Sequence, residues 1–456
     1  MPKQYTKRLA KFAYDLKYKD IPKDAINHLK LCILDTLGCG IFGSTTRGGM
    51  ILADYIHSLD KNKESTIWGT KFRSASSNAA LVNGTLVHGF ELDDYHPLAL
   101  VHPGGIAVTS ALATAESKGK VNGKDFLTAV AVGYELTIRL GFCCAISLFK
   151  RGLHATGSCG TIGSAVAAGK ILNLDKDGML NAIGIAASFP SGLMAAQYGG
   201  MVKRLFAGKA AQNGVTAAQL ASRGFNGAKD VLEAEFGGFC KALCDDYDLH
   251  RLTAGLGKQY GINSVAFKKY SCVGTNLAAL DAVRKIVGEH SFDIQDIKKV
   301  TIKVNYFTKK HSGWEYKPQS IMTAQMNMYY CVAIMLIEGD CFVDQFLERK
   351  LCEPKVLELV KKIDVVVDSE INKLPITQRS ASIVEVDLKM GERFSIRFDH
   401  PKGNANNPMR YEEIKEKFRK LAKRKMISAK IDHIMAAVEK LEELDDMRKF
   451  SHLLAA

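Results

Sequence analysis

The stretch CGTIGSAVAAGKIL, residues 159–172, decides the fold class. Half of its positions are Gly, Ala or Ser, and such small side chains let neighbouring helix axes approach closely. The same composition returns in SSNAALVNGTLVHG (76–89), GGIAVTSALATAES (104–117) and GKAAQNGVTAAQLASRG (208–224). We therefore predict a mainly α protein in which residues 1–268 form the first part of a large, tightly packed helical bundle.

Beyond this bundle the apolar pattern changes its period. Residues 300–306 alternate apolar and polar, 363–367 are β-branched, and 382–398 predict a hairpin with Gly391 in its turn. A helix is expected over Thr323–Ile337. We predict a smaller α+β unit over 269–402, followed by helices over 403–456 that pack back on the bundle.

Net charge limits the classes of partner. The 456 residues include 62 Lys and Arg against 48 Asp and Glu, a formal charge of +14, with 47% hydrophobic residues, which excludes a disordered or collagen-like chain. A basic excess fits nucleic acid, an anionic membrane or a small polyanion. The basic run Lys415–Lys430 holds eight Lys and Arg, but it lies on an amphipathic helix beside several glutamates. No nucleic-acid-binding motif accompanies it, so we expect no nucleic-acid partner.

The eleven cysteines show neither disulfide nor zinc spacing, so we expect reduced, buried thiols and no metal. Residues 1–20 lack the apolar core of a secretory signal. The apolar stretch Phe126–Phe149 contains Glu135 and Arg139, which favours a buried helix over a membrane span. We therefore expect a cytoplasmic protein without a membrane partner.

The densest polar cluster is ELDDYHP (91–97), followed by VHPGG (101–105). Carboxylates this close repel one another unless cations or a functional pocket compensate. The alternative is an exposed loop with a helix N-cap at Asp93 or Asp94.

Three further clusters combine cations or histidine with glycine-rich sequence. His154 precedes a small-residue helix start, where free backbone N–H groups attract anions. Lys203–Arg204 and Lys268–Lys269 are paired cations beside apolar residues, and a lysine drawn into a pocket binds carboxylates or transfers protons. The alternatives are a capping segment for His154 and solvated helix ends for the two pairs.

Taken together, ELDDYHPLALVHPG, GLHATGSCGTIGSA, VKRLFAGKAAQNGVTAAQLASRGFNGA, FKKYSCVG and TAQMNMYYCVAIML resemble the MmgE/PrpD family, in the right order and over nearly the whole chain. The resemblance implies a helical domain with an α+β lid, an active site between them, and a homodimer. It also implies no metal or organic cofactor. The expected substrates are small di- or tricarboxylates, and the expected chemistry is proton transfer at the carbon beside a carboxylate.

The same resemblance assigns residues to roles. It implies substrate binding by cationic and polar side chains, and catalysis by a second, overlapping set. The binding set is Lys203, Arg204, Lys268 and Asp94, and the catalytic set is Glu91, His102, His154, Lys203 and Tyr330.

Three departures from the family pattern limit what the resemblance implies, and one of them, at Val273, lowers the rank of decarboxylation. Glu91 stands where Asp is usual, Phe206 where many members carry His, and Val273 where the decarboxylases carry His. Asn276 lies nearby but cannot supply a proton as an imidazolium does. The prediction is a 2-methylcitrate-dehydratase-like lyase, with an isomerase of iminodisuccinate as the alternative and cis-aconitate decarboxylation ranked lower. A family member that has lost catalysis is a further alternative.

Overall fold

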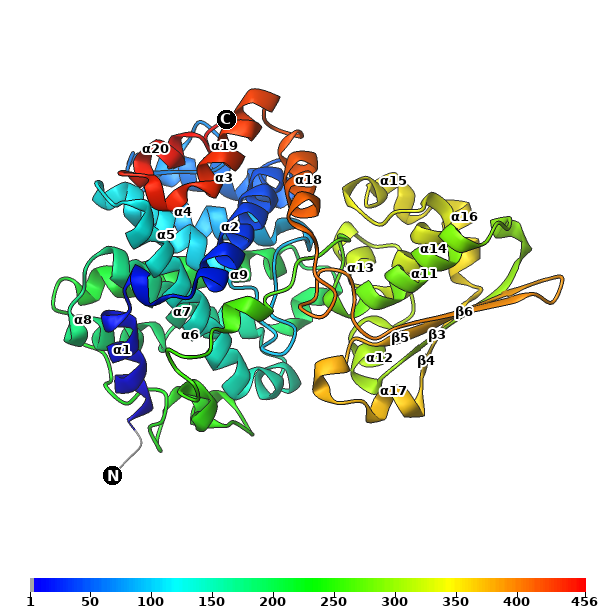
Figure 1. The fold of residues 1–456 in the computed structure, drawn as a ribbon, viewed down its shortest axis with the longest axis horizontal. Helices are drawn as coiled ribbons and strands as arrows, with labels where there is room; N and C mark the ends of the chain where they lie inside the picture. Colours follow the sequence, from blue (N-terminus) through cyan, green and yellow to red (C-terminus); the bar gives the residue numbers. More distant parts are fainter. Residues whose placement is uncertain (1–3) are drawn as a thin grey trace.

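The protein is described by a computed structural model that covers residues 4–456, apart from the side chain of Ile376. A large helical domain, which holds the first and the last described residues, is joined to a smaller α+β domain (Figure 1). The fold is therefore mainly α, as the small-residue segments predict.

Helix α7 (Ala155–Ile171) lies at the centre of the large domain and packs against α6, α9 and α5. Glycine is required at its contacts: a Cβ on Gly163 would lie 1.9 Å from Thr137 Oγ1, and one on Gly208 in α9 would lie 2.0 Å from the Leu81 carbonyl oxygen. The close approach predicted from composition is thus confirmed. The other α-helices of this domain before residue 269 are α1 (Tyr5–Asp15), α2 (Lys23–Gly43), α3 (Arg47–Leu59), α4 (Ser76–Val87), α5 (Gly104–Lys118), α6 (Gly123–Lys150), α8 (Lys176–Ala186), α9 (Val202–Ala221) and α10 (Phe239–Leu243). A short two-stranded sheet joins β1 (Ser65–Thr66) to β2 (Arg73–Ser74).

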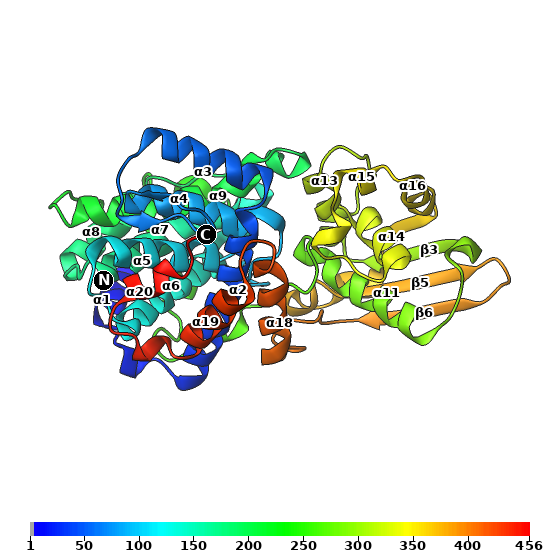
Figure 2. The ribbon, with the colours of Figure 1, turned by 90° about the horizontal axis from the view of Figure 1, so that it is seen from above.

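The smaller domain, here called the lid, is built on a four-stranded sheet of order β4-β3-β5-β6. The central strand β3 (Ile297–Val304) pairs parallel with β4 (Ile363–Val367), with Val300 opposite Ile363. It pairs antiparallel with β5 (Ser382–Leu388), which forms the predicted hairpin with β6 (Arg393–Phe398). Four helices contact this sheet (Figure 2): α11 (Leu277–Glu289), α12 (Tyr306–Ser312), α14 (Met328–Glu338) and α17 (Ser369–Lys373). The lid also contains α13 (Ile321–Gln325) and α16 (Pro354–Val360), which contact α14, and α15 (Glu348–Leu351), which contacts α13.

The helix predicted over Thr323–Ile337 is in fact two helices, α13 and α14. The break falls at Asn327, whose side chain accepts a hydrogen bond from the Tyr330 N–H and so caps α14. An N-cap residue has extended backbone dihedrals, which a continuous helix cannot accommodate.

The C-terminal helices α18 (Tyr411–Ala422), α19 (Ser428–Glu439) and α20 (Met447–His452) pack on the large domain. Apolar residues of α18 such as Phe418 join its core, and α18 lies along α2. Lys417 on α18 pairs with Asp35 on α2 at 2.6 Å and donates to the Leu92 carbonyl oxygen at 2.6 Å. The end of the chain therefore helps to hold the segment that follows Glu91.

Two helices, α2 and α6, are long and apolar enough to cross a membrane by length and composition alone. In the folded chain 78% and 89% of their most apolar stretches are buried, as in the core helices of a packed domain. The cysteines form no disulfide within the described chain, and all but Cys352 are buried.

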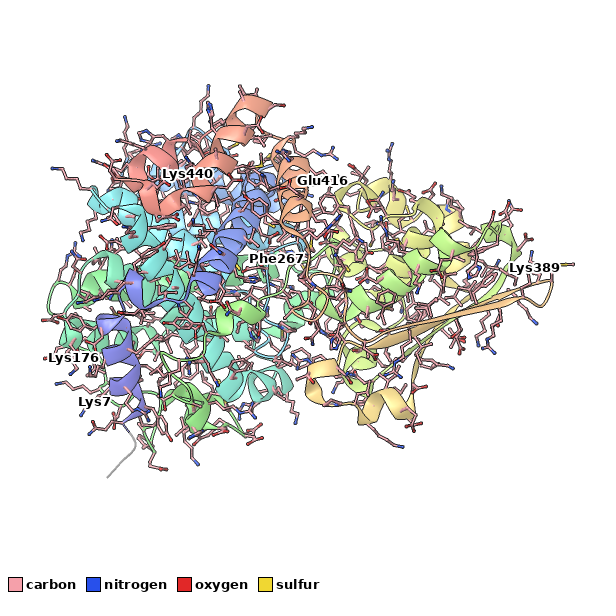
Figure 3. All side chains as sticks on the ribbon, in the orientation of Figure 1. Lys7, Lys176, Phe267, Lys389, Glu416 and Lys440 are labelled. Carbon is pink, nitrogen blue, oxygen red and sulfur yellow. The ribbon has the colours of Figure 1, made fainter. Side chains whose placement is uncertain are left out.

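Much of the basic excess lies on the outer surface. Lys7, Lys176, Lys389 and Lys440 are exposed and project from both domains (Figure 3). The cations that matter for the site are a separate, buried group.

Candidate active site

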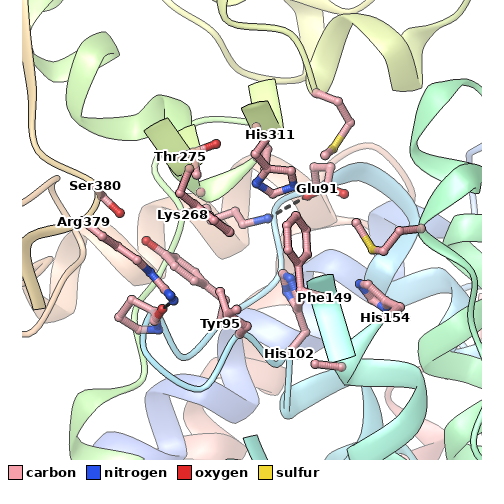
Figure 4. A pocket seen from close by; sticks show the side chains of 18 of the residues that line it. Glu91, Tyr95, His102, Phe149, His154, Lys268, Thr275, His311, Arg379 and Ser380 are labelled. Carbon is pink, nitrogen blue, oxygen red and sulfur yellow. Dashed lines mark hydrogen bonds and ion pairs between the residues drawn. The ribbon is translucent and has the colours of Figure 1, made fainter. Parts of the chain in front are cut away.

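A cavity of about 110 Å³ lies where the large domain meets the lid (Figure 4). This is smaller than the sites that hold drug-sized ligands, so it suits a small organic molecule. Side chains of both domains line it. The polar ones are Glu91, Tyr95, His102, His154, Lys203, Lys268, Thr275, His311, Arg379 and Ser380, and apolar ones include Phe149, Met194, Val273, Phe307 and Met326.

Glu91 is the centre of the charged network. It follows α4 and a short 3₁₀ turn, and its φ of +56° lies in the left-handed region, which is uncommon outside glycine. Its carboxylate is buried and accepts hydrogen bonds from Lys203, from Arg204, and from Lys268 at 2.9 Å. Three cations thus converge on one carboxylate, which leaves the group with a net positive charge.

Burial and charge compete in setting the protonation of this network. Burial alone would raise the pKa of Glu91, but Lys203, Lys268 and Arg204 outweigh it and hold the pKa well below its usual value. Burial lowers the pKa of Lys203 to about 8, although Glu91 partly opposes the shift. Lys203 therefore remains a cation at neutral pH and titrates just above it.

The tautomer of His102 follows from its hydrogen bonds. Its Nδ1 lies 3.1 Å from the Asp93 carboxylate and 3.0 Å from the Asp94 carbonyl oxygen. Both neighbours are acceptors, so Nδ1 carries a proton and Nε2 is the ring nitrogen left to act as a base. Asp93 orients the ring by this contact and receives the Nδ1–H of His88 as well, at 2.8 Å.

His154 precedes α7 at its N-cap position and lies in the cavity wall. Burial first, and then the charge of Lys203, lowers the pKa of this histidine well below its usual value. The ring is therefore neutral at pH 7 and able to accept a proton. The free N–H groups at the start of α7 add a positive potential on the same side of the cavity, next to Ala155.

One group of side chains has the composition of a metal site. Ligand atoms of His88, Asp93 and His102 lie within 4.8 Å of one another. Two imidazoles and a carboxylate are ligands that zinc and related metals accept. In this structure, however, the Nδ1 atoms of both rings are engaged in donating to Asp93.

The structure brings most of the predicted site residues together. Glu91, His102, His154, Lys203 and Lys268 all line the cavity. The segment after Glu91 is buried, and α5 begins only at Gly104, so the alternative of an exposed loop with an N-cap at Asp93 or Asp94 is wrong.

Three predicted residues lie elsewhere. Arg204 is behind the cavity wall, between Glu91 and the Gln325 side chain, which accepts its second hydrogen bond at 2.8 Å. Asp94 is beneath the wall, where it accepts from the Tyr134 hydroxyl at 2.8 Å and from the Gly104 N–H at 3.1 Å. Neither side chain is free to bind a substrate, so their placement in the binding set is corrected to a supporting position.

Tyr330 is the third. It lies in the core of the lid, and its hydroxyl donates to the Gln345 carbonyl oxygen at 2.6 Å. Its ring packs against Tyr316 and Phe346 of the same core, and it is not among the residues that line the cavity. The expectation that Tyr330 acts in catalysis is therefore corrected: it has a structural position.

The sequence motifs missed five polar lining residues: Tyr95, Thr275, His311, Arg379 and Ser380. The ring of Tyr95 lies 5.8 Å from the Lys268 ammonium, and the Arg379 guanidinium donates to the Pro97 carbonyl oxygen. Tyr95 lies inside the ELDDYHP cluster and could have been named with it. His311 and Arg379 belong to lid segments without a distinctive motif, and only the fold places them at the cavity.

These features define a two-domain, mainly α protein with a buried, cationic, histidine-containing cavity at the domain junction. The chain belongs to the MmgE/PrpD family: the MmgE/PrpD N-terminal domain matches residues 7–252 and the C-terminal domain matches residues 270–443.

Its relatives include enzymes of two kinds. It is 32% identical to a cis-aconitate decarboxylase-like protein of Aspergillus oryzae, covering 99% of this chain and 97% of that one. It is 32% identical to human cis-aconitate decarboxylase, covering 100% and 95%. It is 25% identical to the mitochondrial 2-methylcitrate dehydratase of Yarrowia lipolytica, covering 94% and 86%.

Proposed function

We propose that the protein is a cofactor-free lyase that acts on a small di- or tricarboxylate in the cavity at the domain junction. The observation that carries the proposal is the convergence of Lys203, Lys268 and Arg204 on Glu91, beside two histidines. One carboxylate cannot neutralise three cations, so the site attracts further negative charge.

The lining residues divide the chemical work. Lys203, Lys268 and Arg379 are placed to pair with substrate carboxylates and to stabilise charge that develops on them in the transition state. The rings of His102 and His154 are placed to accept a proton from the adjacent carbon. The protein's own cations thereby do the work that a metal would do as a Lewis acid.

Two lyase reactions use this equipment. Dehydration breaks a C–H bond, passes that proton to a base, and releases the hydroxyl as water after an acid protonates it. Decarboxylation breaks a C–C bond and releases CO₂, and the electron pair left on carbon then takes a proton. The full-length relatives named as cis-aconitate decarboxylases, at 30–32% identity, support decarboxylation as the first candidate. Dehydration is the second candidate, because this chain has Val273 where the decarboxylases carry histidine.

The test is exposure of the purified protein to cis-aconitate, citrate, 2-methylcitrate and iminodisuccinate in D₂O, followed by proton NMR. Loss of CO₂ from cis-aconitate identifies a decarboxylase. A new alkene from citrate or 2-methylcitrate identifies a dehydratase, and loss of stereochemistry without a new alkene identifies an isomerase. No change in any of the four acids contradicts the proposal.

We also propose a homodimer. Its support, besides the family resemblance, is an exposed apolar face on α3, where Ile51, Tyr55 and Leu59 recur at helical spacing and are 52%, 57% and 64% exposed. The mass in solution, measured by light scattering, should be twice that of the chain, and Tyr55→Glu should reduce it to that of a monomer. A monomeric unaltered protein contradicts this proposal.

A further inference from the structure

The lid contributes a histidine of its own to the cavity. His311 is in α12 and its ring packs against two aromatic rings that also contact each other, Phe149 of α6 and Phe307 of α12, with centroid distances of 5.2 and 5.5 Å. Its Nδ1 is buried without a hydrogen-bond partner among the described residues. A buried imidazole nitrogen that no protein group satisfies calls for a partner that arrives from outside.

His311 faces the cavity from the other domain than His102 and His154. Those two belong to the large domain, and both lie against the ring of His88, at centroid distances of 4.8 and 5.7 Å. Figure 4 shows His311 apart from them, near Glu91 and Thr275. The cavity therefore has imidazoles on both of its sides, as a reaction with one proton taken and another given requires.

The cavity wall near His311 also contains Val273, the position at which the decarboxylases of the family carry histidine. Val273 lines the cavity, and the segment that follows it is joined to α12 by a contact of 3.0 Å between the Thr275 and Ser312 hydroxyls. His311 directly precedes Ser312 in α12 and lines the same cavity as Val273. An imidazole is thus present near Val273, although it comes from a different element.

We propose that His311 is the proton donor that the lid supplies to the substrate, in place of an imidazole at residue 273. This rests on the proposed function. In decarboxylation the C–C bond breaks, CO₂ leaves, and the carbon that receives the electron pair takes a proton from the His311 imidazolium, which becomes neutral imidazole. In dehydration the same proton goes to the departing hydroxyl, which leaves as water. In both cases the neutral ring takes its next proton from solvent when the next substrate binds.

The charges that face His311 explain how it becomes an acid only with substrate present. In the free protein, burial and then Lys203 lower the pKa of His311 to about 4, with Arg379 and Lys268 acting in the same direction and Glu91 opposing them. A bound polycarboxylate brings negative charge among these cations and raises the pKa. The ring therefore takes up a proton together with the substrate.

The experiment compares His311→Ala with the unaltered protein on whichever of the four acids is converted. We expect kcat to fall at least about 100-fold, the scale of a lost general acid, while KM changes less than about threefold. Added imidazole should restore part of kcat, because the alanine leaves a ring-sized space beside Phe149 and Phe307. His290→Ala, which removes an exposed lid histidine, is the matched control and should retain full activity and show no response to imidazole.

The outcomes separate the two proposals. Absence of turnover by the unaltered protein contradicts the proposed function and the role of His311 together. Turnover that His311→Ala leaves intact contradicts only the role of His311. A fall in kcat that imidazole does not restore and that comes with a lowered melting temperature also overturns it, because that result indicates a packing role.

Discussion

Lys268 Nζ lies 2.9 Å from Glu91 Oε2, and this ion pair joins the segment that enters the lid to the segment that follows α4 in the large domain. Lys268 is 1% exposed and Glu91 is 2% exposed, so the pair is shielded from solvent. Gln325 of the lid reinforces the same junction, since it donates to the Phe90 carbonyl oxygen at 2.9 Å. The chemistry of the cavity and the joining of the domains thus depend on one carboxylate.

Replacement of that carboxylate should destabilise the fold. Glu91→Gln leaves three buried cations without a counter-charge, and we expect a loss of about 3 kcal/mol in the free energy of unfolding. Glu91→Asp keeps the charge and should lose less than half as much. Urea unfolding curves measure both variants, and equal losses would show that side-chain length matters more than charge.

Substrate capture should weaken as the pH rises through about 8. The pKa of Lys203 is lowered to about 8 by burial, so in the free protein this side chain is a cation below that pH and neutral above it. The affinity for a polycarboxylate is therefore fully present below pH 8 and decreases above it. Calorimetric titration with citrate between pH 6.5 and 9.5 measures the change; an affinity that stays constant over this range would contradict it.

Asp93→Asn should reduce kcat by at least about 100-fold. The Asp93 carboxylate holds His102 with its proton on Nδ1, whereas an amide can donate to that nitrogen and stabilise the opposite tautomer. Because Asn is nearly the same size, the melting temperature should change little. Kinetics and thermal unfolding of the same preparation check both points, and unaltered kcat would exclude His102 as the base.

Removal of metal ions should leave the reaction unchanged. His88, Asp93 and His102 could be taken for a metal site, but their hydrogen bonds already orient the two rings. Dialysis against a chelator, followed by elemental analysis and assay, tests this. Loss of activity that zinc or another divalent ion restores would assign these residues to a metal instead.

Tyr330→Phe should retain kcat/KM within about twofold and lower the free energy of unfolding by about 1 kcal/mol, the net contribution of one hydrogen bond. The lost bond is the one from the Tyr330 hydroxyl to the Gln345 carbonyl oxygen, in the core of the lid. Assay and urea unfolding measure the two quantities. A large loss of activity at unchanged stability would restore Tyr330 to the site.

The sequence predicted those elements and site residues whose signal lies in a short, continuous stretch of chain. The small residues around α7 and the alternation around β3 are local patterns, and each predicts its element correctly. Glu91 and Lys203 lie in polar clusters inside apolar sequence, and such clusters point to a buried site.

The errors concern residues whose position depends on contacts between segments far apart in the sequence. Tyr330 was placed by its position in a motif, but its ring packs against Tyr316 and Phe346 in the core of the lid, a contact that no local pattern announces. His311 is preceded by two lysines in a short helix, a pattern that equally fits a solvated surface. Its place in the cavity follows only from how the lid packs on α6.

The central claim is that the cationic cavity converts a polycarboxylate, and proton NMR in D₂O tests it most directly. The measurement compares the unaltered protein, Lys203→Met and the exposed control Lys7→Met on cis-aconitate, citrate and 2-methylcitrate. We predict that the unaltered protein and Lys7→Met convert at least one of these acids at equal rates, and that Lys203→Met loses at least about 100-fold in kcat/KM. Equal conversion by all three proteins, or conversion by none, would contradict the assignment of this cavity as the active site.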